Sequence, residues 1–199
     1  MLDNDRARTS VGRVVDPVAA FLLRIGLTAN SVTIIGTIGI SLSAIWFFPK
    51  GEFFLGTLVI LLFIFSDLID GTMARLSGKP NPIGAFLDST LDRVSDAALF
   101  GSLVLYFANI NSMLIVPAII AGFAAQFISY IRAKAESLQI PMKVGIAERP
   151  ERIILLLVGT GFAGLGWNLA LDISIIVLCV VTVITVIQRL QFAHRFSKL

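Results

Sequence analysis

Long apolar runs dominate the chain, and short polar breaks rich in Pro, Gly and Asn separate them. The runs lie at residues 31–48, 53–75, 84–107, 113–137, 152–169 and 172–190. A helix that crosses a bilayer needs about 20 predominantly apolar residues, and these runs have roughly that length. The pattern therefore predicts six transmembrane helices.

The segment before the first run has a different pattern. Residues 10–26 place apolar side chains at helical spacing but also carry Arg13, Asp16 and Arg24. This combination is typical of an amphipathic helix that lies in the membrane interface. We therefore expect an all-α polytopic membrane protein, in which one membrane domain covers residues 1–199.

Composition and charge agree with this fold class. Hydrophobic residues make up 56% of the chain and charged residues only 15%, which argues against a soluble domain. Fifteen of the 16 Lys and Arg residues fall on one side of the predicted spans, and Lys50 alone falls on the other. The positive-inside rule then predicts a cell-membrane protein with both termini in the cytoplasm. No nucleic-acid partner is expected, and the single cysteine, Cys179, cannot form an internal disulfide.

Four carboxylates lie at the end of the second run and at the start of the third. Asp67 and Asp70 are three residues apart, and Asp88 and Asp92 are four apart, so each pair shares one helix face. The short connection at residues 76–83 makes the two helices antiparallel neighbours, so all four acids can converge on the cytoplasmic side. An uncompensated Asp inside a membrane helix costs roughly 3 kcal/mol.

Metal binding is the compensation that this donor set favours. Oxygen-only ligands suit Mg²⁺ or Mn²⁺, and a pair of such ions serves phosphoryl transfer. Alternatives are a salt-bridged helix pair, a proton path, or a cation transporter whose acids line a pore. The apolar sequence that continues away from the acids favours a one-sided cytoplasmic cavity and hence an enzyme.

Small residues and an arginine accompany the acids. Gly71 and Ala74 would let a ligand approach the backbone, and Gly84 opens the third run. Close helix packing is the alternative reading of each small residue. Arg75 can bind a phosphate through its planar guanidinium.

Together these residues form a pattern, Asp67-x2-Asp70-Gly71-x2-Ala74-Arg75-x8-Gly84-x3-Asp88-x3-Asp92. It resembles the complete signature of the CDP-alcohol phosphotransferases, with all eight fixed residues and every spacer in agreement. The resemblance extends to the six-helix layout with an amphipathic helix before it. It implies a homodimeric transferase that uses CDP-diacylglycerol.

The resemblance also implies a role for each site residue. Asp67, Asp70 and Asp88 would ligate two Mg²⁺ or Mn²⁺ ions per active site, and Asp92 would be the general base and a possible further ligand. Gly71, Ala74 and Arg75 would hold the CDP group. Asn30 and Thr33 resemble a second feature near the nucleotide, although an ordinary helix N-cap explains them equally well. Asp96, one turn beyond Asp92, is expected to give a supporting hydrogen bond.

Basic residues on the cytoplasmic side predict the acceptor. Arginines at helix ends make an anion site, which indicates a phosphorylated alcohol. The strings SYIRAK and ERPER resemble a branch of the family, the bacterial phosphatidylinositol-phosphate synthases, whose acceptor is inositol 1-phosphate. In that branch the acceptor-phosphate pocket corresponds to Ser129, Arg132, Arg152 and Arg189. Glycerol 3-phosphate is the alternative acceptor.

Overall fold

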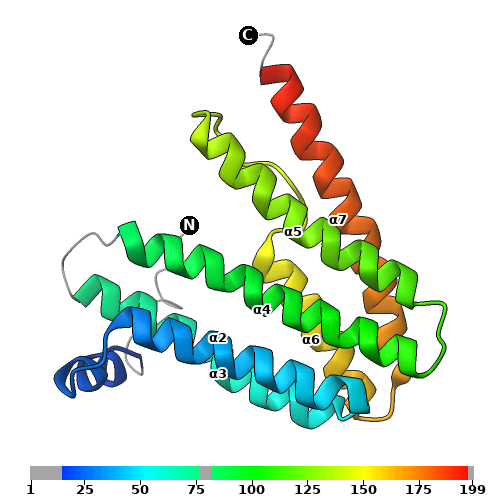
Figure 1. Ribbon diagram of the computed structural model, residues 1–199, viewed down its shortest axis with the longest axis horizontal. Coiled ribbons are helices and arrows are strands. Elements are labelled where there is room, and N and C mark those ends of the chain that lie inside the picture. The colour runs from blue at the N-terminus through cyan, green and yellow to red at the C-terminus, as the bar shows by residue number, and fades with distance from the viewer. Residues whose placement is uncertain (1–14, 77–81, 197–199) are drawn as a thin grey trace, which may run out of the picture. The chain divides into compact units, whose positions relative to one another are not determined.

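The computed structural model describes residues 15–76 and 82–196, except for the side chains of Asp67 and Leu68. Every regular element in these ranges is helical, which confirms the all-α class (Figure 1). A first helix covers residues 15–24. It is followed by α2 (Ala29–Phe47), the 3-10 turn η1 (Phe48–Lys50), α3 (Phe53–Leu76), α4 (Pro82–Asn109), α5 (Ile115–Ser137), α6 (Arg149–Gly164) and α7 (Asn168–Phe196).

Four of the described helices are long and apolar enough to cross a membrane. They are α2 with its η1 extension, α3, α5 and α7. The other two predicted spans form shorter or more polar helices, since α6 has 16 residues and α4 carries Asp88, Asp92 and Asp96. Six spans therefore remain a prediction.

Two predicted boundaries are wrong and one is only partly tested. The fifth apolar run predicts a helix at 152–169, but α6 ends at Gly164. Gly166, two residues later, takes a left-handed φ of 96°. The amides of Gly166 and Trp167 then close the helix end on earlier carbonyls. The sixth helix consequently starts at Asn168 and continues to Phe196, beyond the predicted 172–190. The amphipathic segment is helical over 15–24, and residues 10–14 lie outside the described ranges.

The described chain forms two compact units. The first comprises the chain up to Leu42 together with Val59–Ser95. Here α2 packs closely on α3. Gly39 permits this contact, since a Cβ at that position would collide with the ring of Phe63. Ala19, Val32 and Met73 form its buried apolar cluster. This packing brings the N-terminal half of α2 against the part of α3 that carries the signature.

The second unit comprises Ser43–Leu58 and the chain from Asp96 onward. Its helix α7 packs along both α5 and α6 (Figure 1). A buried cluster of Ile131, Ala135 and Met142 lies between α5, α7 and the segment that joins α5 to α6. The sequence predicts that this end of the unit faces the cytoplasm. The buried hydroxyls of Thr57 and Thr160 are 2.7 Å apart and pair α3 with α6.

Large apolar side chains cover the outer helix faces. Leu62 is 69% exposed, Phe123 is 73% exposed and Leu42 is 63% exposed. Soluble proteins rarely present such continuous apolar surface. The fold is that expected of helices surrounded by lipid.

We expect Gly164→Ala to destabilise the second unit. A Cβ at Gly164 would lie 2.6 Å from the Cα of Phe54, so the backbones of α6 and α3 would have to separate. Overpacking of this kind costs about 1–3 kcal/mol. The thermal unfolding midpoint of the purified protein in detergent should fall.

Gly101→Ala is the matched control, because a Cβ at Gly101 meets no atom within 4 Å. Replacing a mid-helix Gly by Ala at such a position is favourable by about 0.5–1 kcal/mol. Equal midpoints for the two variants would contradict the close contact at Gly164.

Candidate active site

The signature carboxylates occupy the end of α3 and the beginning of α4. Asp67 and Asp70 lie in the last turns of α3, and Asp88 and Asp92 in the second and third turns of α4. Asp70 is buried, at 8% exposure, whereas Asp88 is exposed and the Asp92 side chain is 23% exposed. The side chain of Asp67 lies outside the described residues.

A hydroxyl from α2 orients the buried carboxylate. Thr33 Oγ1 donates to Asp70 Oδ2 at 2.6 Å. This hydrogen bond orients the Asp70 carboxyl group. Thr33 therefore contacts the acidic site directly, and its place beside the nucleotide stays a prediction.

The alternative reading of Asn30 and Thr33 as the helix N-cap is not what the structure shows. The capping contact comes from Thr28, whose Oγ1 accepts from the amide of Ser31 at 3.2 Å. Thr33 lies one turn inside α2, and Asn30 is the second residue of that helix.

Arg93 lies beside the predicted base. Its Nη2 is 3.8 Å from Asp92 Oδ2, and both side chains are partly exposed. Ser95 Oγ also donates to the Asp92 backbone carbonyl at 3.1 Å. Asp92 therefore has a cation from the next residue of its own helix beside it.

The residues expected to hold the nucleotide line an open face of α3. Gly71, Ala74 and Arg75 are all exposed. Among the described residues, no atom lies within 4 Å of the position that a Cβ on Gly71 would take. Close helix packing in this part of the chain therefore does not explain the glycine. Arg75 Nη2 donates to Thr72 Oγ1 at 2.8 Å, which orients the guanidinium along the helix.

The donor set fits a hard divalent ion. All four signature acids offer oxygen atoms at i, i+3 and i, i+4 spacing on two helices, and Asp70 is already oriented by Thr33. Among the side chains that the structure describes, no three acids, histidines or cysteines form a compact metal-binding group. Asp67 is not among those side chains.

The predicted acceptor arginines differ sharply in exposure. Arg152 and Arg189 are each only 1% exposed. Arg189 donates to the carbonyls of Ile128 at 2.7 Å and Val144 at 3.0 Å, and it lies 3.6 Å from a carboxylate oxygen of Glu148. It thereby joins α7 to α5 and to the segment before α6.

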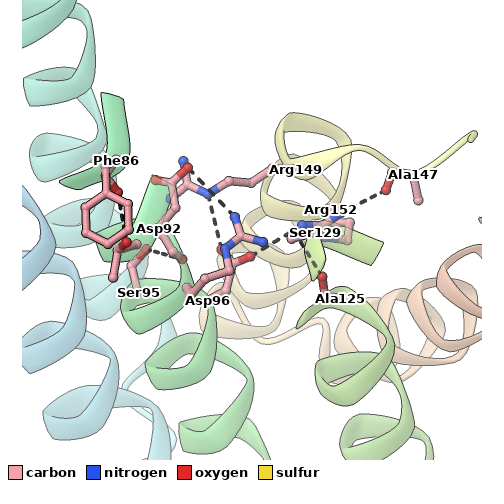
Figure 2. A network of polar contacts seen from close by, with 11 residues as sticks. Phe86, Asp92, Ser95, Asp96, Ala125, Ser129, Ala147, Arg149 and Arg152 are labelled. Carbon is pink, nitrogen blue, oxygen red and sulfur yellow. Dashed lines mark hydrogen bonds and ion pairs between the residues drawn. The ribbon is translucent and has the colours of Figure 1, made fainter. Parts of the chain in front are cut away.

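Arg152 makes a similar set of internal contacts. Its Nη1 donates to the Ala147 carbonyl at 2.9 Å and its Nη2 to Asp96 Oδ2 at 3.3 Å (Figure 2). The Ala147 amide in turn donates to Thr185 Oγ1 at 3.1 Å. Residues 144–148 are therefore held from both α6 and α7.

The other predicted acceptor residues lie on α5. Arg132 is half exposed and pairs with Glu136 at 3.0 Å, while Ser129 Oγ donates to the Ala125 carbonyl at 3.3 Å. Arg149 pairs with Asp96 at 3.2 Å, and 25% of its side chain remains exposed. The sequence predicts Arg149 to be one of the basic residues of this region but predicts no partner for it. Arg132 and Arg149 are therefore accessible from outside the protein, whereas Arg152 and Arg189 are enclosed by it.

Comparison with known proteins supports the chemistry inferred from these residues. The family model for CDP-alcohol phosphatidyltransferases matches residues 26–188. A phosphatidylinositol phosphate synthase of Streptomyces avermitilis is 44% identical over 98% of this chain and 83% of the relative.

Solved structures give the same result. The fold matches crystal structures of a Mycobacterium tuberculosis phosphatidylinositol phosphate synthase at 39% identity. The form with CDP-DAG bound has a TM-score of 0.87 and covers 90% of this chain and 93% of that one. The form in complex with manganese and citrate has a TM-score of 0.84 and covers 88% and 87%.

These matches confirm the resemblance inferred from the signature, and they favour the enzyme over the cation transporter. They also make the apolar helices those of a multi-pass membrane protein. The chain belongs to the CDP-alcohol phosphatidyltransferase family.

Proposed function

We propose that the protein transfers the phosphatidyl group of CDP-diacylglycerol to inositol 1-phosphate, giving phosphatidylinositol phosphate and CMP. The observation that carries this proposal is the complete eight-residue signature on α3 and α4, in a chain that resembles phosphatidylinositol phosphate synthases over nearly its whole length. The synthase of known structure binds CDP-DAG. The basic residues of α5 and α6 give this chain an anion site suited to a phosphorylated acceptor.

The reaction exchanges one phosphorus–oxygen bond for another. The inositol hydroxyl oxygen attacks the phosphorus that bears the diacylglycerol group, and the bond from that phosphorus to the CMP oxygen breaks. Asp92 takes the hydroxyl proton as the new bond forms, because an alcohol is a weak nucleophile without a base. Arg93 lies beside the Asp92 carboxyl group at 3.8 Å.

Asp67, Asp70 and Asp88 would hold two divalent ions, Mg²⁺ or Mn²⁺, with Asp92 as a possible fourth ligand. When bound, such ions neutralise the diphosphate and the charge that develops on departing CMP. Thr33 would orient Asp70 for this task. The manganese-bound relative supports a divalent metal in this fold.

The CDP group would lie against the open face of α3. Gly71 and Ala74 leave the backbone accessible, and Arg75 would contact the diphosphate. Asn30, on the first turn of α2, would approach the nucleotide from the neighbouring helix. This arrangement is supported by the exposure of Gly71, Ala74 and Arg75.

The acceptor phosphate would bind to Arg132 and Arg149. Ser129, Arg152 and Arg189 would complete the pocket, the two buried arginines mainly by holding residues 144–148 in place. Glycerol 3-phosphate also carries a phosphate, and its use is the alternative outcome of the substrate test below.

The membrane arrangement is part of the proposal. Six spans would place both termini and the active site in the cytoplasm, since 15 of the 16 basic residues lie on that side. The family resemblance supports a homodimer of single-domain subunits, 1–199.

Asp92→Asn should leave metal and CDP-diacylglycerol binding intact while turnover falls by at least about 10²-fold, the usual scale for loss of a general base. The amide keeps the size and one oxygen but cannot accept the proton. CMP release and CDP-diacylglycerol affinity would be measured in the same Mg²⁺ buffer.

Two variants bracket this result. Asp88→Asn removes a proposed ligand and should lower turnover and raise the Mg²⁺ concentration needed for it, whereas Asp172→Asn, outside the signature at the start of α7, should keep normal turnover. If Asp92→Asn raises the required Mg²⁺ concentration as Asp88→Asn does, Asp92 is chiefly a metal ligand.

Arg132→Ala should raise the KM for inositol 1-phosphate by about tenfold or more, because a charge-assisted hydrogen bond contributes about 1.5–3 kcal/mol. The KM for CDP-diacylglycerol should change little. The parent enzyme should use unphosphorylated inositol poorly. The parent would be offered inositol 1-phosphate, inositol or glycerol 3-phosphate, and the lipid formed from each would be identified.

The matched control is Glu136→Ala, which breaks the 3.0 Å pair with Arg132 but leaves the guanidinium in place. It should keep the acceptor KM near that of the parent. A parent enzyme that prefers glycerol 3-phosphate, or that uses inositol as well as its phosphate, would refute the proposed acceptor.

Cysteine labelling tests the orientation. In a Cys179→Ser background, Lys50→Cys should react with an impermeant thiol reagent added to intact cells, and Lys143→Cys should react only after the cells are opened. Both side chains are exposed, so access to the reagent depends on the membrane side. The reverse pattern would place the active site outside the cytoplasm.

A further inference from the structure

Asp96 is a fully buried carboxylate that the proposed reaction does not use. It lies on α4 and has 0% exposure. Its Oδ1 accepts from Arg149 Nε at 3.2 Å and its Oδ2 from Arg152 Nη2 at 3.3 Å (Figure 2). One carboxylate therefore contacts two arginines from the first turn of α6.

Both guanidinium groups compensate the charge of this carboxylate. A buried carboxylate without partners is strongly destabilising, so Asp96 depends on the arginines that contact it. The same contacts fix the two guanidinium groups against α4.

The two arginines are not equivalent. Arg152 is buried and its Nη1 donates to the Ala147 carbonyl, so its guanidinium is enclosed by protein. Arg149 is anchored to Asp96 through Nε, yet a quarter of its side chain remains accessible. An anchored, accessible guanidinium loses less conformational entropy when it binds a ligand than one that moves freely.

We propose that Asp96 is a positioning residue for the acceptor site, which sets the direction in which Arg149 presents its guanidinium to the acceptor phosphate. This role rests on the proposed phosphorylated acceptor. Asp96 does not touch substrate. It acts through Arg149, while its contact with Arg152 keeps the first turn of α6 fixed against α4.

A double-mutant cycle tests this role. Asp96→Asn should raise the KM for inositol 1-phosphate by about tenfold, the scale of one charge-assisted hydrogen bond, and change the KM for CDP-diacylglycerol by less than about twofold. In an Arg149→Gln background, the same Asp96→Asn change should add less than about twofold, because the residue through which Asp96 acts is already lost. Additive effects, an equal rise in both KM values, or no rise would overturn the proposal.

Thr160→Val is the control for a purely structural effect. It removes another buried polar contact of the same unit, the 2.7 Å pair with Thr57. It should lower the thermal midpoint without changing the ratio of the two KM values. A changed ratio in this control would show that general loosening produces the Asp96 result, and would overturn it.

Arg149→Lys keeps the proposal testable if Asp96→Asn does not fold. Lysine retains the positive charge, but one ammonium cannot both hold Asp96 and present a fork to phosphate. The acceptor KM should rise by about tenfold. A KM within about twofold of the parent would show that charge alone suffices and that positioning by Asp96 is unnecessary.

Different experiments would contradict the proposed phosphorylated acceptor and the positioning role of Asp96. If the acceptor needs no phosphate, the parent enzyme itself will use inositol as well as inositol 1-phosphate. If only the positioning role is wrong, the parent will require the phosphate and the cycle will be additive.

Discussion

Charge compensation in an apolar bundle is the constraint on which the rest of the structure depends. An aspartate within a membrane helix costs roughly 3 kcal/mol unless something offsets its charge, and this chain carries five between Asp67 and Asp96. The described structure shows two of the solutions. A threonine hydroxyl holds Asp70, and two guanidinium groups hold Asp96. The oxygen donors of the signature as a whole suit divalent metal ions.

The same constraint explains the two buried arginines. The connection between α5 and α6 is irregular, and its carbonyl groups cannot all be satisfied within a helix. Arg189 and Arg152 donate to Val144 and Ala147 in this connection. Gly145 takes a φ of 129° there and leaves no room for a side chain against Thr185. The arginines therefore order the backbone of this connection.

The sequence predicted the elements whose cause is local. Apolar runs and Pro or Gly breaks located the helices, and the regular spacing of the acids, which lie on α3 and α4, predicts the candidate site. The end of α6 was missed because Leu165 and Trp167 make the turn as apolar as the helix before it. The roles of Thr33 and Asp96 were not predictable in detail, since each depends on a residue from another helix. The sequence ERPER also does not show that the Arg149 side chain is partly exposed while the Arg152 side chain is buried.

Helix α4 joins the two halves of the proposed chemistry through its own geometry. Asp92, the proposed proton acceptor, and Asp96, the anchor of Arg149, are four residues apart on one continuous helix. That spacing separates them by about 6 Å along the axis and about 40° around it. Residues four apart lie on the same face of a helix. The proposed base and the carboxylate that contacts Arg149 therefore follow one another along one face of α4.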